Sequence, residues 1–294
     1  MTRTETGNRS AAAQQPGGWA RFGLGAAGRL HSLLRVGVGM EFVGHGACGL
    51  HTKAAWLPYF RVFAVPESVA WKLMPVVGTM DVILGLLALL FPTRAALLYM
   101  GAWGLFTALL RPAAGEGGWE FVERAYNFGI PWALLCLHGF PARGRDWFAR
   151  LSPRDLSLSV GRGRELLWGL RGIVALMLVG HGGFGAFMAK KNLLAFYQGA
   201  GLGGLGIPLE SIRAGIGFLE IALGIVAFLK PNPRYLFFLF VWKLGSELLF
   251  PISGADLACW EVIERGGSYV APLALMVVLQ RFASPPVRPP LAHA

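Results

Sequence analysis

Eight long apolar runs most constrain what this chain can fold into. A helix needs roughly 20 apolar residues to cross the hydrocarbon core of a bilayer. Only 15% of the residues are charged and 54% are hydrophobic, which is unusual for a soluble domain. The runs therefore predict an all-α membrane protein with eight transmembrane helices. They occupy residues 31–50, 71–91, 95–110, 121–139, 166–188, 211–229, 235–250 and 261–280.

The basic residues predict how these helices are oriented. The net charge is +11, but the lysines and arginines cluster in the N-terminal tail and in short loops, not along one surface as nucleic-acid binding would require. Most of them fall on one side of the membrane if the runs alternate in direction. Cytoplasmic loops are enriched in Lys and Arg, so we expect an inner-membrane, multi-pass protein with both termini in the cytoplasm. The lipid bilayer is then its main partner, and nucleic acid is not expected.

The remaining segments are expected to be tails, a linker and connectors. Residues 1–29 are polar and predict a disordered tail, and 282–294 a short C-terminal tail. Residues 141–165 form a basic cytoplasmic linker. Residues 50–70 and 189–210 mix aromatic residues with a few cations, which fits either amphipathic segments at the membrane surface or plain loops.

The cysteines predict neither disulfides nor zinc. Cys48, Cys136 and Cys259 include no C-x-x-C pair, which argues against a disulfide framework and a zinc ribbon. All three lie in or beside apolar runs, so we expect small buried side chains. No metal site is predicted.

The two halves of the chain repeat the same pattern. Val43-Gly44-His45-Gly46 recurs as Val179-Gly180-His181-Gly182. A second series recurs 139 residues later in each case: Pro92, Trp103 and Pro112 at Pro231, Trp242 and Pro251. A nearly constant interval indicates a tandem duplication. We expect two four-helix repeats, 30–140 and 166–281, which run in the same direction about an axis along the membrane normal.

Each repeat ends in a charged motif that opens an apolar run. Trp119–Pro131 reads W-E-F-V-E-R-A-Y-N-F-G-I-P, and Trp260–Pro272 reads W-E-V-I-E-R-G-G-S-Y-V-A-P. On a continuous helix the charged residues would share one face, because they are three or four positions apart. We expect each arginine to pair with the first glutamate of its motif or with another helix. The two faces are Glu120, Glu123, Arg124 and Asn127, and Glu261, Glu264, Arg265 and Ser268.

Other acidic residues lie within the runs. Glu41 and His45 are one helical turn apart and are expected to pair, whereas Met177 replaces the glutamate in the second half. Asp81 and Glu220 each precede a glycine by four positions, and Glu247 lies near the outer end of the seventh run. Because His181 lacks the glutamate partner expected for His45, the two histidine sites are not expected to be equivalent.

The expected topology brings all these groups toward the non-cytoplasmic half of the membrane. Ionisable residues in membrane helices are costly to bury and are functional-site candidates. We predict one polar cavity in each four-helix unit. Helix-tying ion pairs and packed histidines are the structural alternatives. The candidate substrate-binding residues are Glu41, His45, Asp81, Glu120, Glu123, Arg124, Asn127, His181, Glu220, Glu247, Glu261, Glu264 and Arg265.

The Gly-His-Gly motif late in a first helix, with Asp81…Gly85 or Glu220…Gly224 in the second, resembles the DoxX-like membrane family. The likeness occurs twice and covers residues 30–281. Family members are typically single four-helix units, so this chain resembles two fused units. The family takes its name from a subunit of a thiosulfate:quinone oxidoreductase. The resemblance implies a redox- or quinone-associated membrane protein.

Three functional hypotheses remain open. In the first, the protein is a membrane subunit of a quinone-linked oxidoreductase, with a soluble redox partner that supplies electrons. In the second, it is a small-solute or proton-coupled transporter. In the third, it is a structural or assembly protein. The sequence shows no cofactor motif; the resemblance favours quinone, and haem is not expected because no second histidine pair stands at helical spacing on another run. The substrate, the oligomeric state and any joining of the two cavities stay open.

Overall fold

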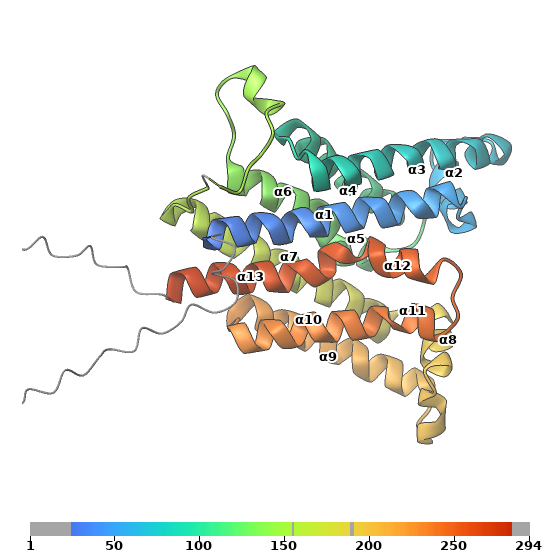
Figure 1. Cartoon of the computed structure of the whole chain (residues 1–294). Coiled ribbons are helices and arrows are strands. Elements are labelled where there is room, and N and C mark those ends of the chain that lie inside the picture. The colour runs from blue at the N-terminus through green and yellow to red at the C-terminus, as the bar shows by residue number, and fades with distance from the viewer. Residues whose placement is uncertain (1–24, 155, 189–190, 284–294) are drawn as a thin grey trace, which may run out of the picture.

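The computed structural model describes residues 25–154, 156–188 and 191–283 (Figure 1). These residues form helices and short loops, with one isolated bridge between Thr93 and Arg150 as their only β-type pairing. The prediction of an all-α fold is confirmed. Most of the two predicted tails, residues 1–24 and 284–294, lies outside the described residues. The last part of the predicted N-terminal tail, from Ala26, belongs instead to the first helix.

Every predicted run is helical. The first half contains α1 (Ala26–Leu50), α3 (Glu67–Leu90), α4 (Arg94–Ala113), α5 (Gly118–Glu123) and α6 (Ala125–His138). The second half contains α7 (Val160–Phe187), α9 (Leu209–Leu229), α10 (Pro233–Glu247), α11 (Leu249–Ile252), α12 (Ala258–Glu264) and α13 (Gly266–Ala283). The shorter elements are η2 (Ala54–Trp56), α2 (Leu57–Arg61), η3 (Gly144–Trp147), α8 (Lys191–Gly199) and η4 (Leu202–Leu205).

The third helix of each half starts in the same way. Thr93 accepts a hydrogen bond from the backbone N–H of Ala96, and Asn232 accepts one from that of Tyr235. Each side chain satisfies a backbone donor that has no partner within the helix. A proline, Pro92 or Pro231, stands before each cap, so the preceding helix ends at the same place in both halves.

Several helices are suited to a membrane. Within the described residues, five helical stretches are long and apolar enough to cross one: Glu67–Leu90, Val160–Phe187, Leu209–Leu229, Pro233–Ile252 and Ala258–Arg281. Their outward faces carry large apolar side chains; Val76 on α3 and Phe218 on α9 are more than half exposed. A surface of this kind requires an apolar environment. The protein is therefore compatible with an integral membrane protein of several spans.

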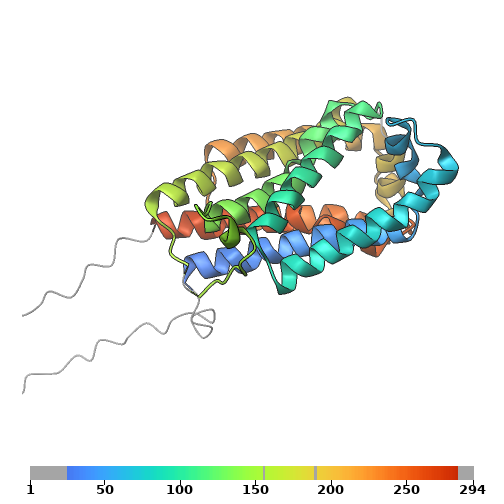
Figure 2. The ribbon, with the colours of Figure 1, turned by 90° about the horizontal axis from the view of Figure 1, so that it is seen from above.

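The chain passes back and forth between two ends of the bundle. The start of α1, the end of α13 and the linker with η3 lie at one end, called here the linker end (Figures 1 and 2). The short helices α2 and α8 lie at the opposite, connector end. Both connectors predicted to be amphipathic segments or loops therefore contain short helices on the same side of the molecule.

The two halves are joined through exchanged contacts. Within each half, the first helix packs on the second: α1 on α3, and α7 on α9. Across the halves, α1 packs on α12 and α13, while α7 packs on α5 and α6. Within each half the last helix also packs on the first, α6 on α1 and α13 on α7. The two predicted four-helix units are therefore packed against each other. The last helices of each half complete the packing of the other half.

Candidate functional site

Each Gly-His-Gly motif brings a histidine to a carboxylate on the next helix. His45 Nδ1 lies 2.7 Å from Asp81 Oδ2, and His181 Nδ1 lies 2.5 Å from Glu220 Oε2. The glycines allow this close approach. A Cβ on Gly46 would lie 2.6 Å from the carbonyl oxygen of Gly78, so no side chain fits there.

Glu41 does not form the predicted pair with His45. The imidazole is bonded to Asp81 instead, because the glycine contacts bring α3 within reach. Glu41 is buried and faces the first turn of α13, where its Oε2 would lie 3.1 Å from a Cβ on Gly267. This oxygen has no hydrogen-bond partner among the described residues.

The two charged motifs are not continuous helices. The first breaks at Arg124, between α5 and α6, and the second breaks at Arg265, between α12 and α13. The predicted single face of i, i+3 and i+4 residues is therefore interrupted. Each break sits against the first helix of the other half. A Cβ on Gly44 would lie 2.2 Å from Glu264 N, and one on Gly180 would lie 2.1 Å from Glu123 N.

The two arginines consequently find different partners. Arg265 Nη1 lies 2.7 Å from Glu261 Oε2, which is the pairing we predicted within the motif. It also reaches Glu247, at 2.9 Å between Nε and Oε2. Arg124 reaches across the halves, where its Nη1 lies 3.8 Å from Glu264 Oε1.

Lys243 is a site residue that the sequence analysis missed. It is 1% exposed, and its Nζ lies 2.7 Å from Glu247 Oε1. Its signal was present: a lysine and a glutamate four residues apart in an apolar run form a pair on one helix face. Glu247 thus contacts two cations, Lys243 and Arg265.

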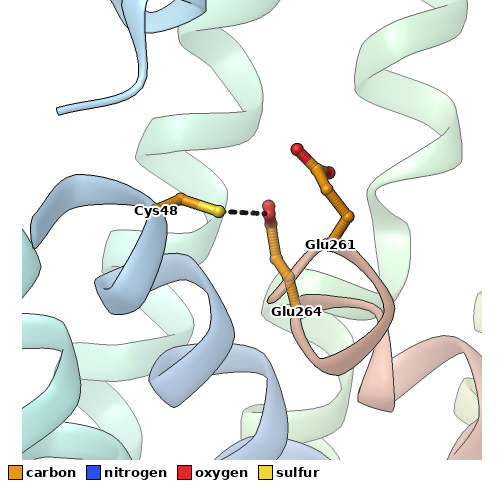
Figure 3. A group of neighbouring side chains, drawn as sticks. All are labelled: Cys48, Glu261 and Glu264. Carbon is orange, nitrogen blue, oxygen red and sulfur yellow. Dashed lines mark hydrogen bonds between the residues drawn. The ribbon is translucent and has the colours of Figure 1, made fainter. Parts of the chain in front are cut away.

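Figure 3 shows Cys48, Glu261 and Glu264 side by side, where α1 meets α12. Their ligand atoms lie within 4.8 Å of one another and could hold a metal ion. The surrounding charges argue against it. Lys53 binds Glu261 and Arg124 lies near Glu264, so both carboxylates already have cationic partners. A further cation would be repelled, and we interpret the cluster as part of the ion-pair network. Of the other cysteines, Cys136 is half-buried and Cys259 is exposed, which corrects our expectation that all three are buried.

The polar residues surround one large cavity of about 830 Å³ at the connector end. Its walls come from both halves of the chain, whereas we predicted that each cavity would lie within one unit. From the candidates it gathers Glu120, Glu123, Arg124, His181, Glu220, Glu247, Glu261 and Arg265. Apolar side chains line the same cavity, including Phe184, Phe196, Leu202, Phe238 and Val241. The cavity is therefore amphipathic.

The first half has a much smaller pocket of about 130 Å³, lined by His45, Asn127 and several aromatic rings. The Trp56 ring stacks on His45, with 4.4 Å between ring centroids. Tyr59, Arg111 and Arg124 line both this pocket and the large cavity. The two sites are therefore neighbours that share a wall.

That shared wall is a hydrogen-bonded cluster at the connector end. The Tyr59 hydroxyl donates to Glu116, and Arg111 Nη1 lies 3.0 Å from Glu116 Oε2. The Arg111 guanidinium also lies over the Tyr59 ring, 4.9 Å from its centroid. Burial is the main cause that raises the pKa of the Tyr59 hydroxyl, so this group is a neutral donor at neutral pH. On the far side of the cavity, burial raises the pKa of Tyr197 to about 12.

Two further histidines form a pair at the linker end. His31 is fully buried, and its Nδ1 lies 2.7 Å from His138 Nε2 at the linker end. The sequence could not reveal this pair, because the two residues are on different helices. His31 lies near the start of α1, whereas His45 lies near its other end, and His138 is the last residue of α6.

Comparisons with protein-family models, with curated proteins and with solved structures found no match. Functional inference therefore rests on the cavity and its residues.

Proposed function

We propose that the protein is a DoxX-like integral membrane protein that binds a quinone or a related small redox substrate in the large cavity. In this proposal it crosses the inner membrane eight times, as two repeats, 30–140 and 166–281, with both termini in the cytoplasm. Helices at all eight apolar runs and the matching histidine–carboxylate pairs support the arrangement. The observation that carries the proposal is the cavity of about 830 Å³, since pockets for small organic ligands are typically about 300–1,000 Å³.

The cavity offers complementary surfaces to a ring with polar oxygens. Its lining includes the aromatic residues Phe184 and Phe238 beside the polar residues His181 and Glu220. Reduction of a quinone to a quinol adds two electrons and two protons. The electrons would come from a soluble redox partner, in line with a membrane subunit of a quinone-linked oxidoreductase. His181 would give one of the two protons to a quinone oxygen from Nε2, because its Nδ1 is engaged by Glu220, and water would supply the other.

The experiment is quinone binding by the full-length protein in lipid nanodiscs. We expect quinone to be present in an organic extract of protein purified from native membrane. We also expect His181→Gln to weaken the binding of an added short-chain benzoquinone about tenfold, which corresponds to about 1.4 kcal/mol. The matched control is His51→Gln, because His51 is exposed at the connector end. Absence of quinone from the extract, together with no binding of the added benzoquinone, contradicts the proposal.

A proton-coupled carrier is the second candidate. It is favoured by one observation: the polar cavity lies between the two halves of the chain, where many carriers bind their substrate. Uptake of a solute into proteoliposomes that depends on a proton gradient would support the carrier and would count against the quinone proposal if quinone binding is absent.

A further inference from the structure

The large cavity extends to the outer face of the bundle between α9 and α10. Ile216 of α9 and Phe238, Val241 and Gly245 of α10 line it on that side. Phe238 is 45% exposed and Val241 is 50% exposed, so these side chains belong both to the cavity wall and to the apolar exterior. In a membrane this exterior faces lipid.

The two helices are held together only toward the linker end. The Tyr235 hydroxyl donates to the carbonyl oxygen of Leu223 at 2.5 Å, and Trp242 Nε1 donates to Glu220 Oε1 at 3.0 Å. Beyond Trp242, toward α8, the described residues form no further hydrogen bond between these helices. Figure 1 shows α9 diverging from α10 in this direction. A side opening results at Gly245.

The first half carries an aromatic ring at the corresponding place. The sequence around Trp103 aligns with that around Trp242, and Phe106 then corresponds to Gly245. The Phe106 ring stacks between Trp103 and Phe63, at 5.4 and 6.0 Å between centroids. A Cβ on Gly245 would meet no described heavy atom within 4 Å. The second half therefore lacks the aromatic ring that stands at this place in the first half.

We propose that the opening at Gly245 admits a lipid-soluble substrate sideways from the bilayer. The substrate is a polar ring with an apolar tail: the ring lies against His181 and Glu220, and the tail runs out between α9 and α10. This inference rests on the proposed function. It adds the route by which the substrate enters and the apolar tail that the substrate carries. A water-soluble solute would gain nothing from an apolar opening onto lipid, whereas a tailed ring pairs its polar head with the polar wall and its tail with Val241 and Phe238.

The test uses the full-length protein in nanodiscs and two probes: a benzoquinone that carries a decyl tail and the same ring without a tail. Quenching of tryptophan fluorescence gives the dissociation constants. Gly245→Phe restores the ring found in the first half. We expect it to weaken binding of the decyl probe at least tenfold, while binding of the tail-less ring changes less than about threefold.

Gly215→Phe is the matched control. Gly215 is an exposed glycine of α9 with open space around it, and it does not line the cavity. We expect binding of both probes to stay within about twofold of the wild type. A general effect of a bulky ring on the membrane-facing surface would appear in both variants.

A second variant is modified only after it has folded, so the effect of the bulky group on binding does not depend on folding. Gly245→Cys, in a background of Cys136→Ala and Cys259→Ala, can be labelled with a pyrene maleimide after purification. We expect labelling to weaken binding of the decyl probe, and labelling of Gly215→Cys to leave it unchanged. Unchanged decyl binding in both Gly245 variants overturns the side opening while leaving the cavity proposal intact. Failure of both probes to bind the wild-type protein overturns the proposed function, and this inference with it.

Discussion

The two halves of the molecule share a framework but differ in their interiors. In both, a histidine from the first helix contacts a carboxylate from the second. Where the first half has Gly104 and Ala108, the second has Lys243 and Glu247 at the corresponding positions. Gly104 packs closely on the backbone of Asn127, whereas Lys243 forms a buried ion pair. The first half therefore fills these positions by packing, whereas the second places a charge beside the large cavity, whose walls both halves form.

This difference suggests a division of labour. Trp56 covers His45 in a pocket of about 130 Å³, which is below the usual size of a ligand site. His181 lies on the cavity of about 830 Å³. The second copy thus supplies the histidine of the large cavity, while the first copy supplies Glu120, Glu123 and Arg124 to its wall. The variants below test this interpretation, from the largest expected effect to the smallest.

The ion-pair network of the second half should be the most sensitive part. Arg265 contacts both Glu247 and Glu261, and all three side chains are largely buried. Arg265→Ala leaves two carboxylates short of a partner and should lower the free energy of unfolding by about 3–5 kcal/mol. Denaturant titration in detergent measures this value.

The control for Arg265 is Arg61→Ala. Arg61 pairs with Glu67 on the exposed surface, where both side chains are more than half exposed. This change should lower the free energy of unfolding by about 1 kcal/mol or less. Equal losses in the two variants would mean that the network contributes no more than a surface pair.

The contacts that join the halves come next. Gly180→Ala places a methyl group against the backbone of Glu123, and Gly44→Ala does the same at Glu264. Each should lower the free energy of unfolding by about 1–3 kcal/mol, because the packed helices must move apart.

Gly172→Ala on α7 is the control for these glycines, since its Cβ would have open space. It should be neutral or stabilising by up to about 1 kcal/mol, because Ala favours a helix over Gly. If Gly180→Ala also leaves the free energy of unfolding unchanged in a denaturant titration, α7 does not pack closely on the backbone at Glu123.

A smaller difference between the halves involves their corresponding tryptophans, Trp103 and Trp242. Trp242 Nε1 donates to Glu220, whereas Trp103 Nε1 has no partner among the described residues. Asp81 has one methylene fewer than Glu220, which explains why its carboxylate does not reach the ring. Trp242→Phe should therefore cost about 1.5 kcal/mol more than Trp103→Phe in the free energy of unfolding. Equal costs would remove this distinction between the halves.

The sequence predicted the helices well and the packing between halves poorly. The apolar runs located the long helices, because burial in a membrane leaves few alternatives, but not the breaks at Arg124 and Arg265. The exchange was not predictable for a specific reason. Both copies carry the same glycine face and the same charged motif, so Gly44 fits Glu123 or Glu264 equally well on paper. Lys243 was missed although it stands four residues before Glu247 in an apolar run. The pairing of His31 with His138 needed the tertiary structure.

The smallest expected effect concerns the wall shared by the two pockets. Tyr59→Phe removes the hydrogen bond to Glu116 and should cost about 1 kcal/mol at pH 8, because Arg111 still holds the carboxylate. Burial raises the pKa of Tyr59 above the usual value for a phenol, about 10. The stability that the neutral hydroxyl contributes is therefore complete below about pH 10 and is lost as the pH rises toward its value in the folded protein. The difference between wild type and Tyr59→Phe should shrink from pH 8 to pH 11 in denaturant titrations. A difference that stays constant over this range would mean that the Tyr59 hydroxyl is not the buried donor to Glu116 that helps to form the wall between the two pockets.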